Sequence, residues 1–240
     1  MRTARFTMLY AGTSGFAYPS WKPRFYAADL SSKRFLEVYA SRLNSVEINY
    51  TFRRLAAATT FQKWLAATSS DFRFCPKAHE RITHKLRLKD ASEFTEVFLK
   101  SLKPLRAEQR LGPVLFQLPP YLRCDEDRLR DFLAILPKDT RYTFEFRHES
   151  WLTDAVYGIL REHDVALCWA ESEKFEVPAV PTASFAYLRL RKQEYRAEER
   201  AAILAKIREP LAAGKDVFAF FKHEETPDGA LQAEELLKQI

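Results

Sequence analysis

The segment TFEFRHESW, residues 143–151, joins a strand-forming apolar run to a cluster of charged side chains. It begins with residues that favour β-strands. Its second half contains Glu145, Arg147, His148 and Glu149, and it ends with Trp151. Two explanations are open. Either the charges neutralise one another as part of the structure, or the end of this strand opens into a site. The position of the strand in the fold decides between them.

Runs of the same kind recur along the whole chain. The eight β-prone runs cover residues 8–14, 45–52, 72–77, 113–118, 141–147, 165–171, 185–191 and 216–223. Apolar residues at helical spacing separate most of them, within residues 36–43, 57–67, 94–105, 129–136, 156–160, 203–211 and 230–237. Asp125 is a suitable N-cap for one of these helices. The stretch 172–184, which holds Pro178 and Pro181, is predicted to be a loop.

Strands that alternate with helices predict an α/β protein with parallel βαβ units. Eight units in 240 residues fit a single (β/α)8 barrel of the TIM type, so residues 1–240 are predicted to form one domain. The functional site of such a barrel lies at the C-terminal ends of the strands. An open doubly wound sheet is the alternative, and the missing Gly-rich first turn counts against its Rossmann form.

Composition excludes several classes of protein. The chain has a net charge of +6 and a pI of about 9.2, which suits an anionic partner, although the surplus is small. It has no Gly-rich phosphate loop, no apolar run near the ~18 residues of a membrane helix, and no secretory signal. Its three cysteines are widely spaced and are predicted to be reduced thiols of a cytoplasmic protein. Nothing in the sequence indicates an oligomeric state.

Five motifs, in consistent order, carry a resemblance to a known family. They are GTSGFAYPSWKPRFY (12–26), SVEINYTF (45–52), ITH (82–84), LGPVLFQLPP (111–120) and EFRHESW (145–151). Together they resemble the DUF72 family, also called the YecE-like proteins, from about residue 9 to the C-terminus. The resemblance implies a TIM-barrel fold and no known activity. A fold-level similarity to barrels of the endonuclease IV type is an analogy only.

Two places depart from the pattern of that family. After the seventh strand the chain reads RLRKQEY, with Arg191 where many relatives resemble RLHG. At the eighth strand it reads FFKHEE, with Lys222 and His223, where many relatives resemble YFNN. The site of this chain is therefore expected to be more cationic than is usual in the family.

Side chains two residues apart on a strand share a face, so several polar residues are expected to converge at the mouth of the barrel. This set has two carboxylates, two amides and five cations: Glu47, Asn49, Lys77, Gln117, Glu145, Arg147, Arg189, Arg191 and Lys222. Glu47 and Glu145 are the candidate acid/base residues, and the others are candidate substrate-binding residues. Trp151 is either a stacking platform for the substrate or an apolar anchor for the next helix.

The charge of this set favours an anionic ligand. We expect an enzyme or binder for a phosphorylated or otherwise anionic small molecule, clamped by arginine and lysine, with a hydrolase, lyase or isomerase as the possible enzyme class. Nucleic-acid binding, or phosphodiester hydrolysis of the endonuclease IV kind, is the first alternative. A non-catalytic binding barrel is the second. The nearby cations should lower the pKa values of both Glu47 and Glu145. A glycosidase needs one neutral carboxylic acid, so these cations argue against that class.

Metal binding is weakly indicated. His79, His84, His148 and His223 follow strand ends, but no HxH or HExxH spacing exists, and a cationic mouth repels a divalent ion. No cofactor is predicted, and a divalent metal is kept as a minor alternative. Aromatic and basic residues interleave in YPSWKPRFY (18–26), where the aromatic rings are expected to fill the top of the barrel.

Overall fold

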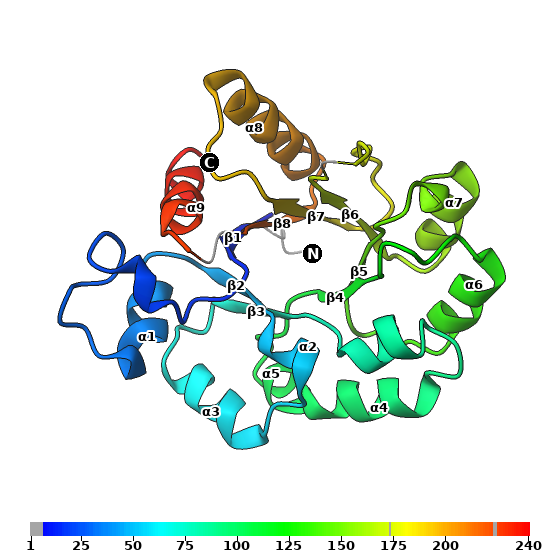
Figure 1. Cartoon of the computed structure of the whole chain (residues 1–240), viewed down its shortest axis with the longest axis horizontal. Coiled ribbons are helices and arrows are strands. Elements are labelled where there is room, and N and C mark those ends of the chain that lie inside the picture. Colours follow the sequence, from blue (N-terminus) through cyan, green and yellow to red (C-terminus); the bar gives the residue numbers. More distant parts are fainter. Residues whose placement is uncertain (1–6, 173, 223–224) are drawn as a thin grey trace, which may run out of the picture.

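Eight parallel strands follow one another along the part of the chain that the structure describes. The structure is a computed structural model, and it describes residues 7–172, 174–222 and 225–240. The strands are β1 (Leu9–Thr13), β2 (Ser45–Ile48), β3 (Arg73–Pro76), β4 (Val114–Gln117), β5 (Tyr142–Glu145), β6 (Ala166–Ala170), β7 (Phe185–Leu190) and β8 (Asp216–Phe221). Figure 1 shows them gathered at the centre of the molecule, with the helices around them. A strand is present in each of the eight predicted runs, although the second strand ends at Ile48 and the rest of the run 45–52 turns into a helix.

The helices occupy the connections between the strands. They are α1 (Phe35–Ala40), α2 (Tyr50–Arg53), α3 (Ala58–Ala66), α4 (Ser92–Ser101), α5 (Lys103–Ala107), α6 (Glu126–Ala134), α7 (Asp154–Glu162), α8 (Ala197–Ala212) and α9 (Asp228–Lys238). Three short 3-10 turns are η1 (Pro19–Trp21), η2 (Ser32–Arg34) and η4 (Glu149–Trp151), and a five-residue π-helix is η3 (Arg81–Lys85). Asp125 caps α6, as predicted, by accepting from the Arg128 N–H at 3.0 Å.

One predicted helix is divided in two, and one predicted loop is present. The predicted helix at 94–105 is divided into α4 and α5, and Pro104, which has no N–H to donate, lies in the first turn of α5. The described residues of 172–184 form neither helix nor strand, which confirms the predicted loop there.

Backbone pairing divides the strands into two parallel groups. One is a curled six-stranded sheet in the order β1-β8-β7-β6-β5-β4, and the other is the pair β2-β3. Isolated parallel bridges join the groups, between Ser14 and Glu47 on one side and, on the other, between Phe74 and Leu111 and between Lys77 and Leu115. The parallel α/β prediction is therefore confirmed, whereas a continuous eight-stranded ladder is not present among the described residues.

Side chains take the place of the ladder between β1 and β2. Asn44 accepts from the Ala11 N–H at 2.8 Å and donates to the Leu9 carbonyl at 2.8 Å. The hydroxyl of Tyr39 lies 2.8 Å from the Thr13 N and 3.0 Å from the carbonyl oxygen of Ser45. These contacts satisfy backbone groups that a regular ladder would otherwise pair.

Gly12 explains why β1 and β2 come so close. A Cβ atom at this position would lie 1.9 Å from the Ser45 carbonyl oxygen, a distance that no side chain tolerates. Only glycine therefore fits the closest approach of the two strands.

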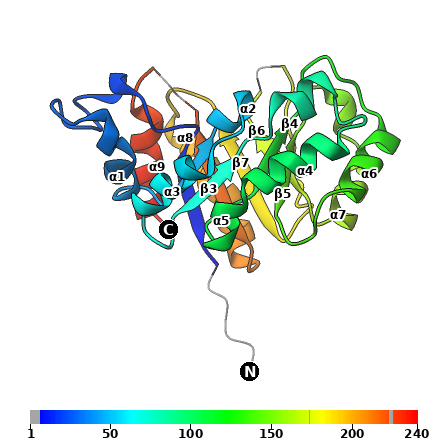
Figure 2. The same ribbon diagram turned by 90° about the horizontal axis from the view of Figure 1, so that it is seen from below.

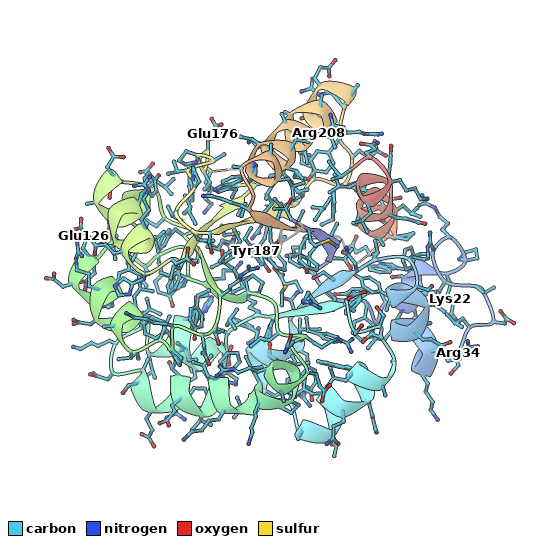
Figure 3. The ribbon with its side chains drawn as sticks, turned by 180° about the vertical axis from the view of Figure 1, so that it is seen from behind. Lys22, Arg34, Glu126, Glu176, Tyr187 and Arg208 are labelled. Atoms are coloured by element: carbon cyan, nitrogen blue, oxygen red, sulfur yellow. The ribbon has the colours of Figure 1, made fainter. Side chains whose placement is uncertain are left out.

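The space that the curled strands enclose is filled by side chains. A cluster of buried residues from several strands includes Tyr10, Leu115, Cys168, Tyr187 and Phe218. The rings of Tyr10 and Phe218 stack with their centroids 4.7 Å apart. Figure 3 shows Tyr187 at the centre of the molecule, whereas the labelled charged residues lie toward its outside. These buried side chains thus form an apolar core on the inner side of the strands.

The larger apolar core lies between the strands and the surrounding helices, and includes Phe74, Phe116, Phe132 and Leu160. In the side view of Figure 2, α2 lies above β3. Among the described residues, none of the helices is both long enough and apolar enough to cross a membrane.

Candidate functional site

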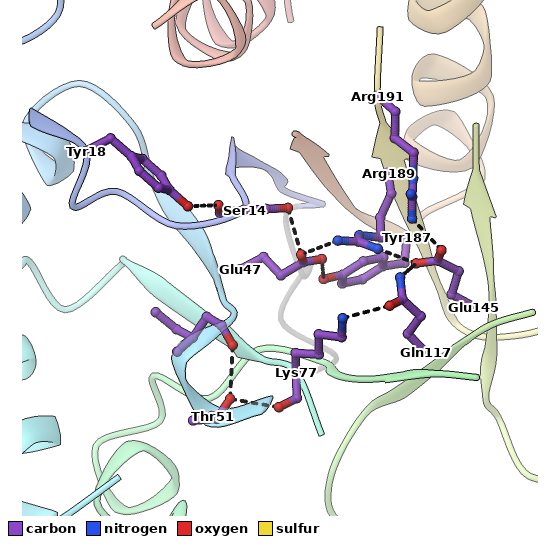
Figure 4. Close-up of polar contacts among 11 residues, drawn as sticks. Ser14, Tyr18, Glu47, Thr51, Lys77, Gln117, Glu145, Tyr187, Arg189 and Arg191 are labelled. Atoms are coloured by element: carbon purple, nitrogen blue, oxygen red, sulfur yellow. Dashed lines mark hydrogen bonds and ion pairs between the residues drawn. The ribbon is translucent and has the colours of Figure 1, made fainter. Parts of the chain in front are cut away.

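A buried arginine joins two buried glutamates at the C-terminal ends of the strands (Figure 4). Arg189 of β7 donates through Nη2 to Glu47 of β2 at 2.8 Å, and through Nη1 to Glu145 of β5. The three side chains are 2%, 0% and 2% exposed, respectively. The guanidinium group of Arg189 therefore bridges two carboxylates that are far apart in the sequence.

Glu47 has no solvent-exposed surface. Its Oε1 accepts from the Ser14 hydroxyl at 2.7 Å in addition to Arg189, and its Oε2 accepts from the Tyr187 hydroxyl at 2.8 Å. Burial and the neighbouring carboxylate raise the pKa of Tyr187 well above its usual value, so the phenol keeps its proton and remains a donor. Both oxygens of Glu47 are thus occupied by protein groups.

Glu145 ends β5 and is held from three sides. Its Oε2 accepts from the Gln117 amide at 2.9 Å and from Arg189, and its Oε1 accepts from Arg191. Burial alone would raise the pKa of Glu145, but the two guanidinium groups outweigh it and lower the pKa to about 2. Glu145 is therefore ionised at neutral pH and holds no proton to donate.

Gln117 of β4 links this carboxylate to Lys77, which follows β3. The Lys77 ammonium donates to the Gln117 carbonyl oxygen at 2.7 Å, while the Gln117 amide nitrogen donates to Glu145. Burial, with the charge of Arg189 as the next cause, lowers the pKa of Lys77 to about 8. We call the connected set Glu47, Lys77, Gln117, Glu145, Arg189 and Arg191 the polar cluster.

Three predicted residues form no side-chain hydrogen bond or ion pair with the polar cluster among the described residues. Asn49 is half-buried at the N-terminus of α2, because the chain leaves the strand after Ile48, and its buried Oδ1 has no hydrogen-bond partner among the described residues. Arg147 is exposed and Lys222 is half-buried. The charge of Lys222 contributes to the lowered pKa of Lys77.

A pocket of about 700 Å³ opens beside the polar cluster. The charged residues that line it are Glu145, Arg147, Glu171, Lys174, Arg191, Lys192 and Glu194. Glu171 is already bonded, because it accepts from the Tyr195 hydroxyl at 2.6 Å and from the Lys192 N–H at 3.1 Å. Arg147 and Arg191 thus face one solvent-accessible space.

Trp151 does not join the other predicted site residues. Its side chain is fully buried, its indole N–H donates to the Leu122 carbonyl at 2.8 Å, and its ring stacks on Phe146 with centroids 4.8 Å apart. A fully buried ring offers no platform to a substrate. Its contacts match the second expectation, an anchor, although it holds the loop at Leu122.

The aromatic residues of the first long loop are also buried. Trp21 and Tyr26 are shielded from solvent, and the Tyr26 ring stacks on Phe35 of α1 with centroids 4.2 Å apart. Phe25 contacts Tyr39 of the same helix, with ring centroids 6.1 Å apart. These rings therefore form a local core with α1.

The sequence did not single out Phe52 and gave His84 only as a metal candidate. The Phe52 ring lies 4.1 Å from the Lys77 ammonium and 5.1 Å from the His84 ring. His84 lies in the π-helix η3, where its Nδ1 is 2.8 Å from the Thr83 hydroxyl. Burial and then the Lys77 charge lower the pKa of His84, so the imidazole is neutral at pH 7.

The other histidines are distributed among separate loops. His79 accepts from the Arg81 N–H at 3.1 Å, and His148 accepts from the Ser150 N–H at 3.2 Å. His223 lies outside the described residues. Within the described ranges, no group of three or more His, Cys, Asp and Glu side chains is arranged to bind a metal ion.

The charge at the end of β5 therefore has two parts. Glu47, Glu145, Arg189 and Arg191 neutralise one another, which is the structural explanation of the opening motif. Lys77, Arg147 and Lys222 add three positive charges, and among the described residues no carboxylate forms a salt bridge with Lys77. The positive charge of Lys77, Arg147 and Lys222 is therefore the property that distinguishes this site.

A family profile with the description "Protein of unknown function DUF72" matches residues 10–240. Among curated proteins, the UPF0759 protein YunF from Bacillus subtilis (strain 168) is 27% identical over 156 residues, which cover 62% of this chain and 54% of YunF. The match thus spans about half the length of that relative.

Two solved structures extend the similarity to the whole fold. A DUF72 family protein from Thermotoga maritima MSB8 superposes with a TM-score of 0.86 at 27% identity, covering 97% of this chain and 98% of that chain. A DUF72 family protein from Enterococcus faecalis V583 has a TM-score of 0.81 at 18% identity, covering 97% and 94%. The second similarity concerns the fold alone.

Proposed function

Because the chain belongs to the DUF72 family, whose description gives no function, we propose one from the site: the protein binds an anionic small molecule at the C-terminal ends of its strands. A phosphorylated or carboxylated compound has the required charge. The observation that carries this proposal is the environment of Lys77, a buried cation whose ammonium group, among the described residues, donates a hydrogen bond to a neutral amide and forms no salt bridge.

Burial of an ion without a counterion is costly. Lys77 is 9% exposed, and Arg189 and Lys222 add like charge to its surroundings. A bound anion would supply the missing counterion and would raise the pKa of Lys77 toward its usual value. The free protein therefore holds a site whose electrostatic energy improves when an anion enters.

The surrounding groups fit the remaining parts of such a ligand. Arg147 and Arg191 line the adjoining pocket, and a guanidinium matches the geometry of phosphate or carboxylate oxygens. The site thus favours a small molecule that carries an acidic group.

We assign the two glutamates to positioning. Glu47 is sealed by Ser14, Tyr187 and Arg189, and Glu145 is ionised and accepts from three donors. Neither carboxylate is free to exchange a proton with a substrate in this arrangement. Their role in the proposal is to hold Arg189 and Arg191 in place.

Isothermal titration of the purified chain with inorganic phosphate, pyrophosphate and citrate at ~50 mM ionic strength tests the proposal. We expect at least one of them to bind. The double variant Arg147→Gln with Lys222→Met should bind about tenfold more weakly, the effect of roughly 1.4 kcal/mol. A matched control, Arg161→Gln with Lys63→Met, removes two exposed cations from α7 and α3 and should bind within about twofold of the parent.

Two outcomes would overturn this function. One is that none of the three anions binds, and the other is that the two double variants bind them equally well. A titration with single-stranded and duplex DNA separates the nucleic-acid alternative, which requires affinity that falls steeply with salt. Binding of DNA, with no binding of the small anions, would favour that alternative.

We also infer that the eight strands and their helices act as one closed (β/α)8 barrel in a single domain. The isolated bridges on either side of β2-β3 and the match along 97% of the chain to a whole DUF72 protein support this inference. Cooperative unfolding in one transition is the expected behaviour, and two separate transitions would contradict it.

A further inference from the structure

The backbone around Lys77 is fixed on both sides. Its N–H donates to the Ile48 carbonyl at 3.0 Å, which prolongs the pairing of β2 with β3. Its carbonyl accepts from the buried Thr51 hydroxyl at 2.7 Å, and the same hydroxyl lies 3.0 Å from the Ile48 carbonyl. The side chain therefore starts from a rigid position.

The amine itself lies between an aromatic ring and an amide. Phe52 is 4.1 Å from Nζ on one side, and the Gln117 oxygen is 2.7 Å away on another. Because the second Gln117 contact, to Glu145, fixes which way the amide points, the Gln117 oxygen faces Lys77. These contacts orient the amine and leave it without a carboxylate, which would hold it in the charged form.

Such surroundings activate a lysine as a nucleophile. Burial and nearby cations disfavour the ammonium form, so a larger share of the molecules carries a neutral amine at Lys77 near pH 8 than at an exposed lysine. The neutral amine has the lone pair that attacks a carbonyl carbon. One of the cations that favour this form, Lys222, is also among the groups proposed above to bind the acidic part of a ligand.

We propose that Nζ of Lys77 forms a Schiff base with the carbonyl carbon of an anionic aldehyde or ketone held at the strand ends. This inference rests on the proposed anion site and specifies the class of substrate. It makes the protein a candidate for carbonyl chemistry that begins with an imine, in place of the carboxylate acid/base chemistry expected from Glu47 and Glu145.

Formation of the Schiff base is a condensation that releases water and needs no oxidant or reductant. The nitrogen lone pair forms the C–N bond while the carbonyl π-electrons move to oxygen, which gains a proton as the nitrogen loses one. The resulting carbinolamine is protonated on its hydroxyl and expels water, and the nitrogen lone pair then forms the C=N bond of the protonated imine. The imidazole of His84, which contacts the same Phe52 ring, is a neutral group that can carry these protons.

Reductive trapping of the full chain tests the proposal. The protein is incubated at pH 8 with glycolaldehyde phosphate and sodium cyanoborohydride, and the adduct is located by intact-mass and peptide mass spectrometry. We expect one adduct per chain on Lys77, formed at least tenfold faster than on any other lysine, and slowed by excess inorganic phosphate. Lys77→Met should lose this adduct, whereas Lys63→Met should keep it. Mapping of the unsubstituted protein gives the answer even if Lys77→Met does not fold.

The outcomes separate this proposal from the anion site. If phosphate binds in the titration but Lys77 is labelled no faster than exposed lysines, the Schiff base is wrong and the anion site stands. If uncharged glycolaldehyde labels Lys77 as fast as its phosphate does, and phosphate does not compete, the amine is reactive but the anion site is wrong. No binding together with no selective labelling would overturn both.

Discussion

Arg189 and Glu47 form an ion pair at 2.8 Å that is almost completely shielded from solvent. Tyr187 and Ser14 complete the shell of Glu47, and the other end of the guanidinium contacts Glu145. A pair of this kind contributes little net stability compared with apolar residues, yet it is costly to break, because the partner is left buried and charged.

Arg189→Met should therefore destabilise the protein strongly. The substitution leaves Glu47 and Glu145 without their shared counterion, and we expect a loss of about 3–5 kcal/mol in the free energy of unfolding. Chemical denaturation measures it. Arg130→Met is the control, since its pair with Glu162 is exposed, and it should cost less than about 1 kcal/mol. An effect of Arg189→Met as small as that of the control would show that the buried bridge is absent.

Lys77 should make the stability of the fold depend on alkaline pH. Its pKa is about 8 in the folded chain against 10.5 for an ordinary lysine, so between these values the unfolded chain binds more protons. The free energy of unfolding contributed by this group therefore rises with pH across that window. Measured as the parent minus Lys77→Met, the rise should be on the order of 3 kcal/mol between pH 7 and pH 11. A flat difference would mean that Lys77 titrates normally.

Anion binding should be accompanied by proton uptake near pH 8. The bound anion stabilises the Lys77 ammonium, so molecules with a neutral amine take a proton from the buffer. Titrations in buffers of different ionisation enthalpy measure this uptake, which should fall toward zero at pH 6, where Lys77 is already charged. Binding with no uptake at pH 8 would place the anion away from Lys77.

Gln117→Glu should abolish much of the anion affinity with little change in shape. The new carboxylate would face Lys77 and act as its counterion, while it would repel Glu145 at the other end. We expect at least tenfold weaker phosphate binding and a stability loss of about 1–3 kcal/mol. Gln117→Met removes the amide without adding charge and should lose less affinity; the reverse order would contradict this account of Lys77.

Trp151 should affect stability and leave anion binding alone. Trp151→Ala removes a buried ring, its stacking on Phe146 and its bond to Leu122, at a cost of about 3–5 kcal/mol. Trp151→Phe should lose mainly the hydrogen bond, about 1 kcal/mol. Denaturation and phosphate titration of both variants check this. Loss of binding in a folded Trp151→Phe protein would return Trp151 to the site.

Local periodicity was sufficient to predict the eight strands and most helices, because each signal lies within about ten residues of sequence. The arrangement of the polar cluster depends instead on the registers of separate strands. Arg189 and Glu47 are 142 positions apart, and nothing in the sequence determines which of five cations bridges the two carboxylates. The set of residues could be predicted, but their pairing could not.

Other differences arise where tertiary contacts override local preference. SVEINYTF is β-prone throughout, yet the chain turns into α2 after Ile48, where Thr51 bonds to the end of β3. Asn49 therefore does not lie on a strand beside Glu47. Phe52 and His84 were missed as a pair, because a lone aromatic residue and a lone histidine carry no spacing signal. Their proximity follows from the π-helix η3, which has no known sequence pattern here.

The polar cluster links β2 and β3 to β4, β5 and β7, across strand groups that backbone pairing leaves nearly separate. Its members are therefore constrained by the fold itself. A lineage that acquires a new substrate has little freedom to change Arg189, Gln117 or Glu145, since any single replacement weakens the scaffold. Divergence of specificity should accumulate at Arg147 and Lys222, whose side chains can vary without disturbing that scaffold.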